Sequence, residues 1–490
     1  MSDLVKLTIK ETLEGLKNKK FSAVELSKAH LDRIRKENPN LNAFVLVDEA
    51  HTLNEAKKSD QRIQAGQMGL IEGIPIAVKD LFCTKGFLST SCSKILQDFT
   101  PAYESTVTSN LYNNGGVMIG KTNMDEFAMG SANVTSALGN VNGPWVSNEG
   151  ELVTPGGSSG GASASVSAFL AQGALGSDTG GSVRQPASFT GTVGFKPSYG
   201  RCSRWGMIAF SSSLDQAGVI TRTVDDSAIL LQSIMGYDTK DSTSANIALP
   251  NLIDACKSID VKGMKIAIPK EYYEVGVPDE INQMWQEGIE FLKKAGAEVS
   301  EVSLPHTKYG LSAYYIIAPA EASSNLARYD GVRYGLKGSD FNSLDELYEN
   351  TRAQGFGAEV KRRIMIGTYV LSSSNYDSCF LQAQRVRRLI AQDFKNVFEK
   401  FDAILTPTCI SDAFAVNKQL TPLEMYKNDL FTIPASLAGL PCISIPAKIS
   451  KRELPLGLQI IGKNFAEETV IKVAKFLESS FGFDIHKWRN

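Results

Sequence analysis

A chain of 490 residues exceeds the size at which one hydrophobic core usually stops growing, so it can form a large enzyme domain or two or three folding units. With 43% hydrophobic and 21% charged residues, its composition is that of a soluble globular protein and excludes the disordered and fibrous classes. The formal net charge of −2 excludes an overall basic field that would attract nucleic acid.

The N-terminal residues lack the charged start and apolar stretch of a signal peptide, and no run of about 18 apolar residues occurs. We therefore expect a soluble, cytoplasmic protein without membrane association. The seven cysteines stand singly, with no Cys-x-x-Cys pair that would indicate zinc or redox chemistry. We expect reduced, structural thiols and no bound metal.

The first predicted elements are a capped helix and two short strands. Ser22 and Glu25 form a capping-box pattern, and apolar residues follow at helical spacing. Residues 71–80 are mostly apolar and predict a strand that carries Lys79 near its end. Residues 116–120, which are bounded by glycines, predict a second short strand.

The remaining elements alternate between helices and strands. Residues 161–175 are rich in alanine and serine and predict a helix whose small side chains permit close packing. Further helices are predicted at 279–295, 378–400 and 467–478, and a buried strand at 401–405. This alternation favours an α/β fold in which helices cover both faces of a central mixed β-sheet.

Two glycine-flanked serines, Ser158 and Ser182, stand 24 positions apart, and an isolated lysine, Lys79, lies upstream. A serine hydroxyl is a poor nucleophile until a base removes its proton, and in Ser-Lys sites that base is a neutral lysine. Because the pKa of lysine in water is about 10.4, the lysine must be desolvated to be neutral at physiological pH. An apolar strand provides such surroundings. The alternative is a structural lysine that pairs with Asp80.

The glycines before Ser182 fit an oxyanion hole. Because glycine lets consecutive backbone N–H groups converge, such a turn can direct two donors at a developing oxyanion. The predicted donors belong to Thr179, Gly180, Gly181 and Ser182. The alternative is a plain glycine turn. A flexible linker at 156–161 is disfavoured because a helix-forming run follows it directly.

These motifs resemble the signature of a known family. Residues 157–161 and 176–187, together with Lys79, are similar to the amidase signature. Within this family, nearly the whole chain resembles the glutaminase subunits, or A subunits, of the tRNA-dependent amidotransferases. The segments that carry this resemblance are residues 72–75, 120–131, 213–216, 321–328, 355–364 and 428–430.

The resemblance implies one amidase signature domain over residues 1–490, with an α/β fold. Its catalytic core would span about 65–230, and residues 231–490 would complete the sheet, the substrate pocket and the C-terminal helices. Ser182 would attack the side-chain amide of glutamine. Ser158, after a cis peptide bond, would relay the proton to Lys79 as the ultimate base, and the acyl-enzyme would be hydrolysed to glutamate.

The resemblance also implies a pocket for the amino-acid end of glutamine. Arg363 would bind the α-carboxylate, for which a guanidinium fork is suited, and Asp429 would hold the α-ammonium. Tyr314 would help to close the pocket. The neighbouring Arg362 leaves the carboxylate assignment open by one position, and residues 361–363 also fit a solvated helix face.

The resemblance further implies a heterotrimer with B and C subunits. The B subunit would use ATP and magnesium to activate glutamate on tRNA(Gln), contact this Glu-tRNA(Gln) and receive the ammonia, and the small C subunit would link the two larger chains. This chain has no Gly-x-x-x-x-Gly-Lys-Ser/Thr loop, so we expect no cofactor in it. The basic residues 385–388 fit a solvated helix face or a contact with RNA or a partner.

Three other functions compete with this prediction. Residues 157–161 match the Gly-x-Ser-x-Gly pattern of α/β-hydrolases, but none of the four histidines stands in a supporting motif. A stand-alone amidase of small amides is the closer alternative, although Arg363 and Asp429 suit an amino-acid substrate. An inactive scaffold would not need the lysine and both serines. Residues 133–134 and 144–153 depart from the amidotransferase pattern and leave the catalytic residues untouched.

Overall fold

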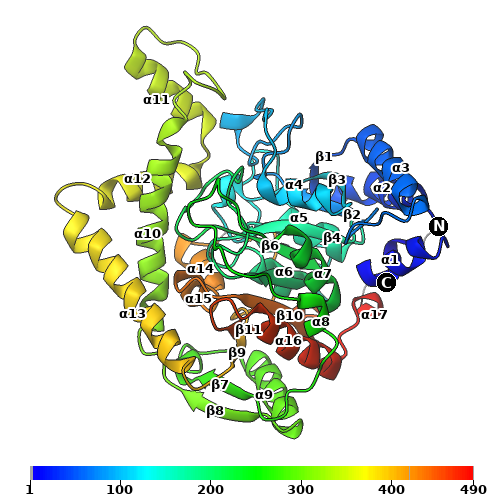
Figure 1. Ribbon diagram of the computed structural model, residues 1–490. Helices are drawn as coiled ribbons and strands as arrows, with labels where there is room; N and C mark the ends of the chain where they lie inside the picture. Colours follow the sequence, from blue (N-terminus) through cyan, green and yellow to red (C-terminus); the bar gives the residue numbers. More distant parts are fainter. Residues whose placement is uncertain (1–3, 419, 489–490) are drawn as a thin grey trace.

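The computed structural model describes residues 4–418 and 420–488, which are built around a mixed β-sheet of eleven strands (Figure 1). The spatial order is β1-β3-β2-β4-β6-β5-β10-β11-β9-β7-β8. The strands are β1 (Phe44–Leu46), β2 (Pro75–Lys79), β3 (Val117–Thr122), β4 (Gly173–Asp178), β5 (Val193–Lys196), β6 (Gln216–Thr221), β7 (Lys265–Pro269), β8 (Glu298–Val302), β9 (Ala403–Pro407), β10 (Cys442–Ile449) and β11 (Pro455–Gly462).

Helices surround this sheet. They are α1 (Ile9–Lys17), α2 (Ala23–Leu41), α3 (Glu49–Gln64), α4 (Thr106–Asn113), α5 (Gly160–Ser167), α6 (Arg184–Thr190), α7 (Val224–Ile234), α8 (Leu252–Ala255), α9 (Asp279–Lys294), α10 (Gly310–Asn325), α11 (Leu344–Gly355), α12 (Ala358–Val370), α13 (Gln382–Val397), α14 (Pro422–Tyr426), α15 (Ile433–Leu437), α16 (Glu467–Phe481) and α17 (Ile485–Trp488). None of the described helices is long and apolar enough to cross a membrane.

The sheet is mixed, as the sequence predicts. Strands β3, β2 and β4 run parallel, as do β9, β7 and β8, whereas the pairings from β4 through β6, β5, β10 and β11 to β9 are antiparallel. The pairing of β5 with β10 joins strands from 65–230 to strands from 231–490. The assignment of residues 1–490 to one domain stays a prediction, and it is compatible with this continuous sheet.

Helices cover both faces of the sheet. Neighbouring residues of a strand point to opposite faces. In β4 and β6, Ala174 and Ile220 pack with residues of α5, whereas Leu175 and Val219 belong to the larger core that includes residues of α7 and α16. The small side chains of α5, all buried, let this helix lie close against the strands.

Helices α10, α12 and α13 form a layer beside the sheet, with α11 at its outer end (Figure 1). Helix α10 packs against α12, α13 and α15. This layer therefore brings residues from the second half of the chain toward the carboxyl end of β4. Helices α1 and α17, near the two ends of the chain, lie close together on the side of the molecule away from α10, α12 and α13 (Figure 1).

Most predicted elements are confirmed, but the predicted helix 161–175 is wrong in its second half. Helix α5 ends at Ser167, Phe169 adopts a left-handed φ of 59°, and β4 begins at Gly173. The pairing of β4 with β2 and β6 overrides the local helix preference of the alanines there. The capping box of Ser22 and Glu25 is confirmed at the start of α2.

Candidate functional site

Lys79 ends strand β2 and is completely buried. Its Nζ lies 2.8 Å from the Oγ of Ser158, 2.8 Å from the Oγ of Ser159 and 2.9 Å from the Oγ of Ser177. When Lys79 is protonated, its three N–H groups can donate to these three hydroxyls. When it is neutral, two N–H groups remain and its lone pair can accept a hydrogen bond from one of the hydroxyls. Ser159 and Ser177 were not predicted as contacts of Lys79, although both lie within the two glycine-flanked motifs.

The surroundings of Lys79 favour a neutral amine. Burial lowers its pKa to about 7, and the more distant carboxylates of Asp125 and Asp178 only partly oppose this effect. The alternative pairing with Asp80 is wrong. The carboxylate of Asp80 lies 3.3 Å from the Nζ of Lys121, which is also buried.

The two serine motifs lie side by side. The N–H of Ser159 donates to the carbonyl of Ser182 at 3.2 Å, and the peptide bond between Gly157 and Ser158 is cis. Ser158 is fully buried, whereas Ser182 is 8% exposed. Within the described residues, the Ser182 hydroxyl makes no hydrogen bond, so it is available to a substrate. Catalytic hydrogen bonds often form only when substrate is bound.

The turn after β4 presents unused backbone donors. The N–H groups of Thr179, Gly180, Gly181 and Ser182 donate no hydrogen bond to any part of the chain that the structure describes. The carboxylate of Asp178 instead accepts the next N–H group, that of Val183, at 3.2 Å. The turn therefore has the free donors that an oxyanion hole requires.

A buried ion pair holds this turn. The Nε and Nη2 of Arg184 lie 2.9 and 2.8 Å from the carboxylate oxygens of Asp178, and both side chains are completely buried. The same guanidinium donates to the carbonyl of Gly180 at 3.0 Å. Burial raises the pKa of Asp178, but the positive charge of Arg184 outweighs it and holds that pKa below its usual value. Neither residue was predicted to have a role, although both belong to the second serine motif.

Tyr314 and Asp429 lie directly on the glycine turn. A Cβ added to Gly180 would lie 2.9 Å from the Cζ of Tyr314, and one added to Gly181 would lie 2.6 Å from the Oδ1 of Asp429. Both positions therefore require glycine, because a larger side chain would clash with Tyr314 or Asp429. The Oδ1 of Asp429 is buried and has no hydrogen-bond partner among the described residues, and burial raises the pKa of this carboxyl to about 7. Such an acceptor suits a cationic donor from a ligand.

Arg363 points into the protein and Arg362 points away from it. Arg363, on α12, is 3% exposed, and its Nε lies 2.8 Å from the Oε1 of Glu359. The side chain of Arg362 is 45% exposed and pairs with the other oxygen of Glu359. Three aromatic rings surround the Arg363 guanidinium, with centroids 5.4 to 5.8 Å away: Phe210, Tyr315 and Tyr426.

A cavity of about 170 Å³ lies beside Arg363 and is also lined by Asp125, Ser131 and Tyr426. The carboxylate of Asp125 accepts the backbone N–H groups of residues 133–135 in the wall of this cavity. The side chain of Asn133 takes part as well, because its Oδ1 accepts the N–H of Gly161 at 3.2 Å. The cavity provides space for a small ligand next to the guanidinium.

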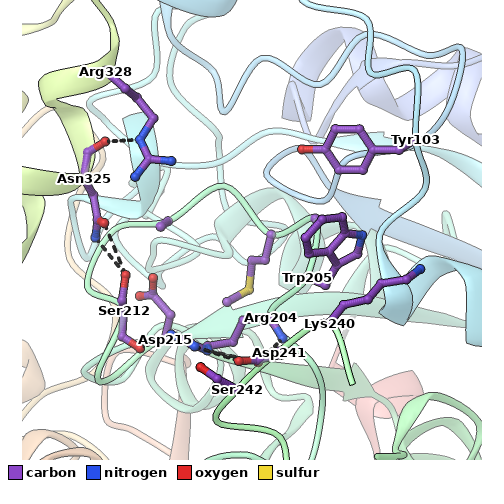
Figure 2. A pocket seen from close by; sticks show the side chains of 13 residues that line it. Tyr103, Arg204, Trp205, Ser212, Asp215, Lys240, Asp241, Ser242, Asn325 and Arg328 are labelled. Carbon is purple, nitrogen blue, oxygen red and sulfur yellow. Dashed lines mark hydrogen bonds and ion pairs between the residues drawn. The ribbon is translucent and has the colours of Figure 1, made fainter. Parts of the chain in front are cut away.

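A second cavity, of about 330 Å³, is lined by residues from the segments 204–215 and 240–242 and by Tyr103, Asn325 and Arg328 (Figure 2). Its wall includes Asp215, which accepts a hydrogen bond from the Oγ1 of Thr179 at 2.7 Å and whose pKa burial raises to about 6. In Figure 2, Arg204 pairs with Asp241, at 2.7 Å, while Tyr103, Trp205 and Lys240 lie on the opposite side from Arg328. No sequence pattern predicted this cavity.

The basic residues 385–388 do not form one surface. Arg387 turns inward, donating to the carbonyl of Leu437 at 2.9 Å and to the Oγ of Ser213 at 2.7 Å. Arg385 and Arg388 are exposed. These two arginines therefore fit a solvated helix face as well as a contact with RNA or a partner, whereas Arg387 connects α13 to α15 and to the segment before β6.

Comparisons with known proteins agree with this geometry. The family model described as Amidase matches residues 25–471. The glutamyl-tRNA(Gln) amidotransferase subunits A of Rickettsia bellii (strain RML369-C) and Orientia tsutsugamushi (strain Ikeda) are 58% and 57% identical, each over 98% of both chains. A crystal structure of the corresponding subunit from Thermotoga maritima is 40% identical with a TM-score of 0.80, covering 98% of this chain and 96% of that chain.

Replacing Arg184 with methionine should lower the free energy of unfolding by about 3 to 5 kcal/mol, because it leaves the buried carboxylate of Asp178 unpaired. Urea denaturation measures this loss. The matched control is Arg388→Met at an exposed position of α13, which should change stability by less than about 0.5 kcal/mol. Equal stability of the two variants would contradict the anchoring role of Arg184.

Proposed function

We propose that this chain, which belongs to the amidase family, releases ammonia from glutamine as the A subunit of a glutamyl-tRNA(Gln) amidotransferase. The observation that carries the proposal is the 2.8 Å contact between the Nζ of a completely buried Lys79 and the Oγ of Ser158, beside the turn that carries Ser182. This arrangement can activate a serine without histidine. The high identity to subunits A from two bacteria supports the substrate class.

The reaction begins with proton transfer away from Ser182. Neutral Lys79 takes the proton of Ser158, and Ser158 takes that of Ser182, whose Oγ attacks the side-chain amide carbon of glutamine. The free N–H groups of the turn stabilise the oxyanion that forms. Lys79 returns its proton through Ser158 to the amide nitrogen, so that ammonia leaves as the acyl-enzyme forms. Water, deprotonated by the same relay, then hydrolyses the ester on Ser182 to glutamate, and the proton returns to the Oγ of Ser182. No metal or cofactor takes part in these steps.

The α-carboxylate and the α-ammonium distinguish glutamine from simple amides. Arg363 binds the α-carboxylate, since its guanidinium is buried beside the cavity whereas that of Arg362 is largely exposed. The unpartnered Oδ1 of Asp429 accepts the α-ammonium, and Tyr314 closes the pocket above Gly180. These roles distinguish the proposal from a stand-alone amidase of small amides.

The ammonia is used by a partner. A B subunit with ATP and magnesium activates the glutamate of Glu-tRNA(Gln) and converts it to Gln-tRNA(Gln), and a C subunit links the two chains in a cytoplasmic heterotrimer. The name of the curated relatives, subunits A of an amidotransferase, supports this assignment. The tRNA binds mainly to the B subunit, which fits the near-neutral charge of this chain.

Replacing Ser182 with alanine should lower glutamate release by the assembled complex by about a thousandfold or more, because the nucleophile is lost. Glutamate is measured with glutamine as substrate, in the presence of the B and C subunits, ATP and Glu-tRNA(Gln). Ser479→Ala, on the exposed face of α16, is the control and should be unchanged. Unchanged turnover by the Ser182 variant would eliminate the mechanism, and fast hydrolysis of unrelated amides by the isolated chain would favour a stand-alone amidase.

The catalytic rate should increase as the pH rises through about 7 and then level off. Burial holds the pKa of Lys79 near 7, and only the neutral amine, which predominates above that pH, can accept a proton. The pH profile of kcat between 5.5 and 9 tests this, since kcat reports groups in the substrate complex. A kcat that stays constant over this range would exclude Lys79 as the base.

Replacing Arg363 with alanine should raise KM for glutamine by about a hundredfold, because a buried charge-assisted contact to the carboxylate is worth about 3 kcal/mol. The adjacent variant Arg362→Ala is the matched control, and its KM should change by less than about threefold. Steady-state glutaminase kinetics measure both. The reverse order of effects would move the carboxylate site to Arg362.

A further inference from the structure

Two adjacent buried carboxylates, Asp125 and Glu126, follow strand β3 and connect different parts of the molecule. The N–H of Asp125 donates to the carbonyl of Ser158 at 3.3 Å. A Cβ on Gly157 would lie 2.1 Å from the Oδ2 of Asp125, so this side chain packs directly on the turn that carries Ser158. The position of Asp125 is thus fixed against the proton relay.

Glu126 faces the opposite direction, toward α12. Its Oε2 accepts the backbone N–H of Gly357 at 2.9 Å, and its Oε1 accepts a hydrogen bond from the hydroxyl of Ser93. A Cβ on Gly357 would lie 2.3 Å from Oε2, so the approach requires glycine. Ser93 also lies 3.4 Å from the carbonyl of Gly355. The carboxylate therefore holds the short connection between α11 and α12.

Gly357 is the N-cap of α12, and α12 carries Arg363. The carboxyl group of Glu126, whose pKa burial raises to about 7, provides a hydrogen-bond acceptor for one of the unpaired N–H groups at this helix start. Arg363 lies six positions after Gly357, which corresponds to about 9 Å along the helix axis. Any shift of the helix start is therefore transmitted along α12 to the guanidinium.

Aromatic packing supports the same joint. Phe127, which follows Glu126, has its ring centroid 5.8 Å from that of Phe356 and 5.2 Å from that of Tyr329. Phe356 directly precedes Gly357. The segment 126–127 thus contacts the start of α12 by one hydrogen bond and one ring cluster, while residue 125 contacts the serine turn.

We propose that Glu126 is a positioning residue that fixes α12, and with it the location of Arg363, relative to the serine relay. This inference rests on the proposed function, because it takes Arg363 as the group that binds the α-carboxylate. It assigns Glu126 a role in recognising that carboxylate and none in proton transfer. Removing Glu126 frees the start of α12, and the guanidinium no longer meets the carboxylate at the right distance.

The test compares two substrates in the assembled complex. Glutamine has an α-carboxylate, and 4-aminobutanamide is glutamine without it. Glu126→Ala should raise KM for glutamine roughly tenfold, the expected effect of losing a buried hydrogen bond to a charged group. It should leave kcat for glutamine, and kcat/KM for 4-aminobutanamide, within about twofold of the wild-type values. Equal losses on both substrates would overturn the proposal.

Conservative variants distinguish a positioning role of Glu126 from a general disruption of the fold. Glu126→Gln keeps an oxygen that can accept the Gly357 N–H, so it should restore most of the affinity for glutamine. Glu126→Asp keeps the charge but is one methylene shorter, so it should raise KM as the alanine variant does, and it replaces that variant if alanine prevents folding. Glu349→Ala, an exposed carboxylate on α11, is the matched control and should behave as wild type.

The double variant Glu126→Ala with Arg363→Ala gives an independent readout. If Glu126 acts through Arg363, the double variant should have the same KM as Arg363→Ala alone, whereas independent roles would give multiplied effects. A wild-type KM for glutamine in a folded Glu126→Ala variant would overturn this inference and leave the proposed function intact. Absence of glutaminase activity in the wild-type complex would overturn both.

Discussion

The ion pair between Arg184 and Asp178 lies where the separate parts of the site meet. Besides Asp178, the guanidinium binds the carbonyls of Gly180 and Thr432 and the Oε1 of Gln459 in β11. One fully buried cation therefore fixes β4, the glycine turn, β11 and the start of α15. Because an arginine has five N–H donors in a rigid fork, it can hold several chain segments at once. Its removal would leave a buried carboxylate that could not reach water.

Burial also sets the chemistry of the site. Three hydroxyls contact Lys79, and no carboxylate among the described residues pairs with it, so its neutral form is favoured near pH 7. Burial likewise raises the pKa of Asp429 to about 7. Burial thus destabilises the protonated form of Lys79 and the ionised form of Asp429, and a cationic partner would stabilise the carboxylate of Asp429. A glutamine ammonium would supply that partner when it enters.

The site is assembled from two halves of the chain. Lys79 and the serine turns come from strands and loops of the first half, whereas Tyr314, Arg363 and Asp429 come from α10, α12 and the segment before α15. The close approach of Tyr314 and Asp429 to Gly180 and Gly181 shows how tightly these halves are fitted. Substrate recognition by such a site depends on helices that the catalytic core alone does not contain.

The α/β class, the serine-lysine set and most elements could be predicted from the sequence, because glycine spacing, capping patterns and apolar runs act locally, and the resemblance of the motifs indicated the family. Three features became evident only in the folded chain: Lys79 contacts three serines instead of Asp80, β4 interrupts the predicted helix 161–175, and Arg363 turns inward while Arg362 stays outside. The tertiary structure also showed the roles of Asp178 and Arg184 at the turn. These features depend on pairing between distant strands and helices, and on burial that no local pattern encodes.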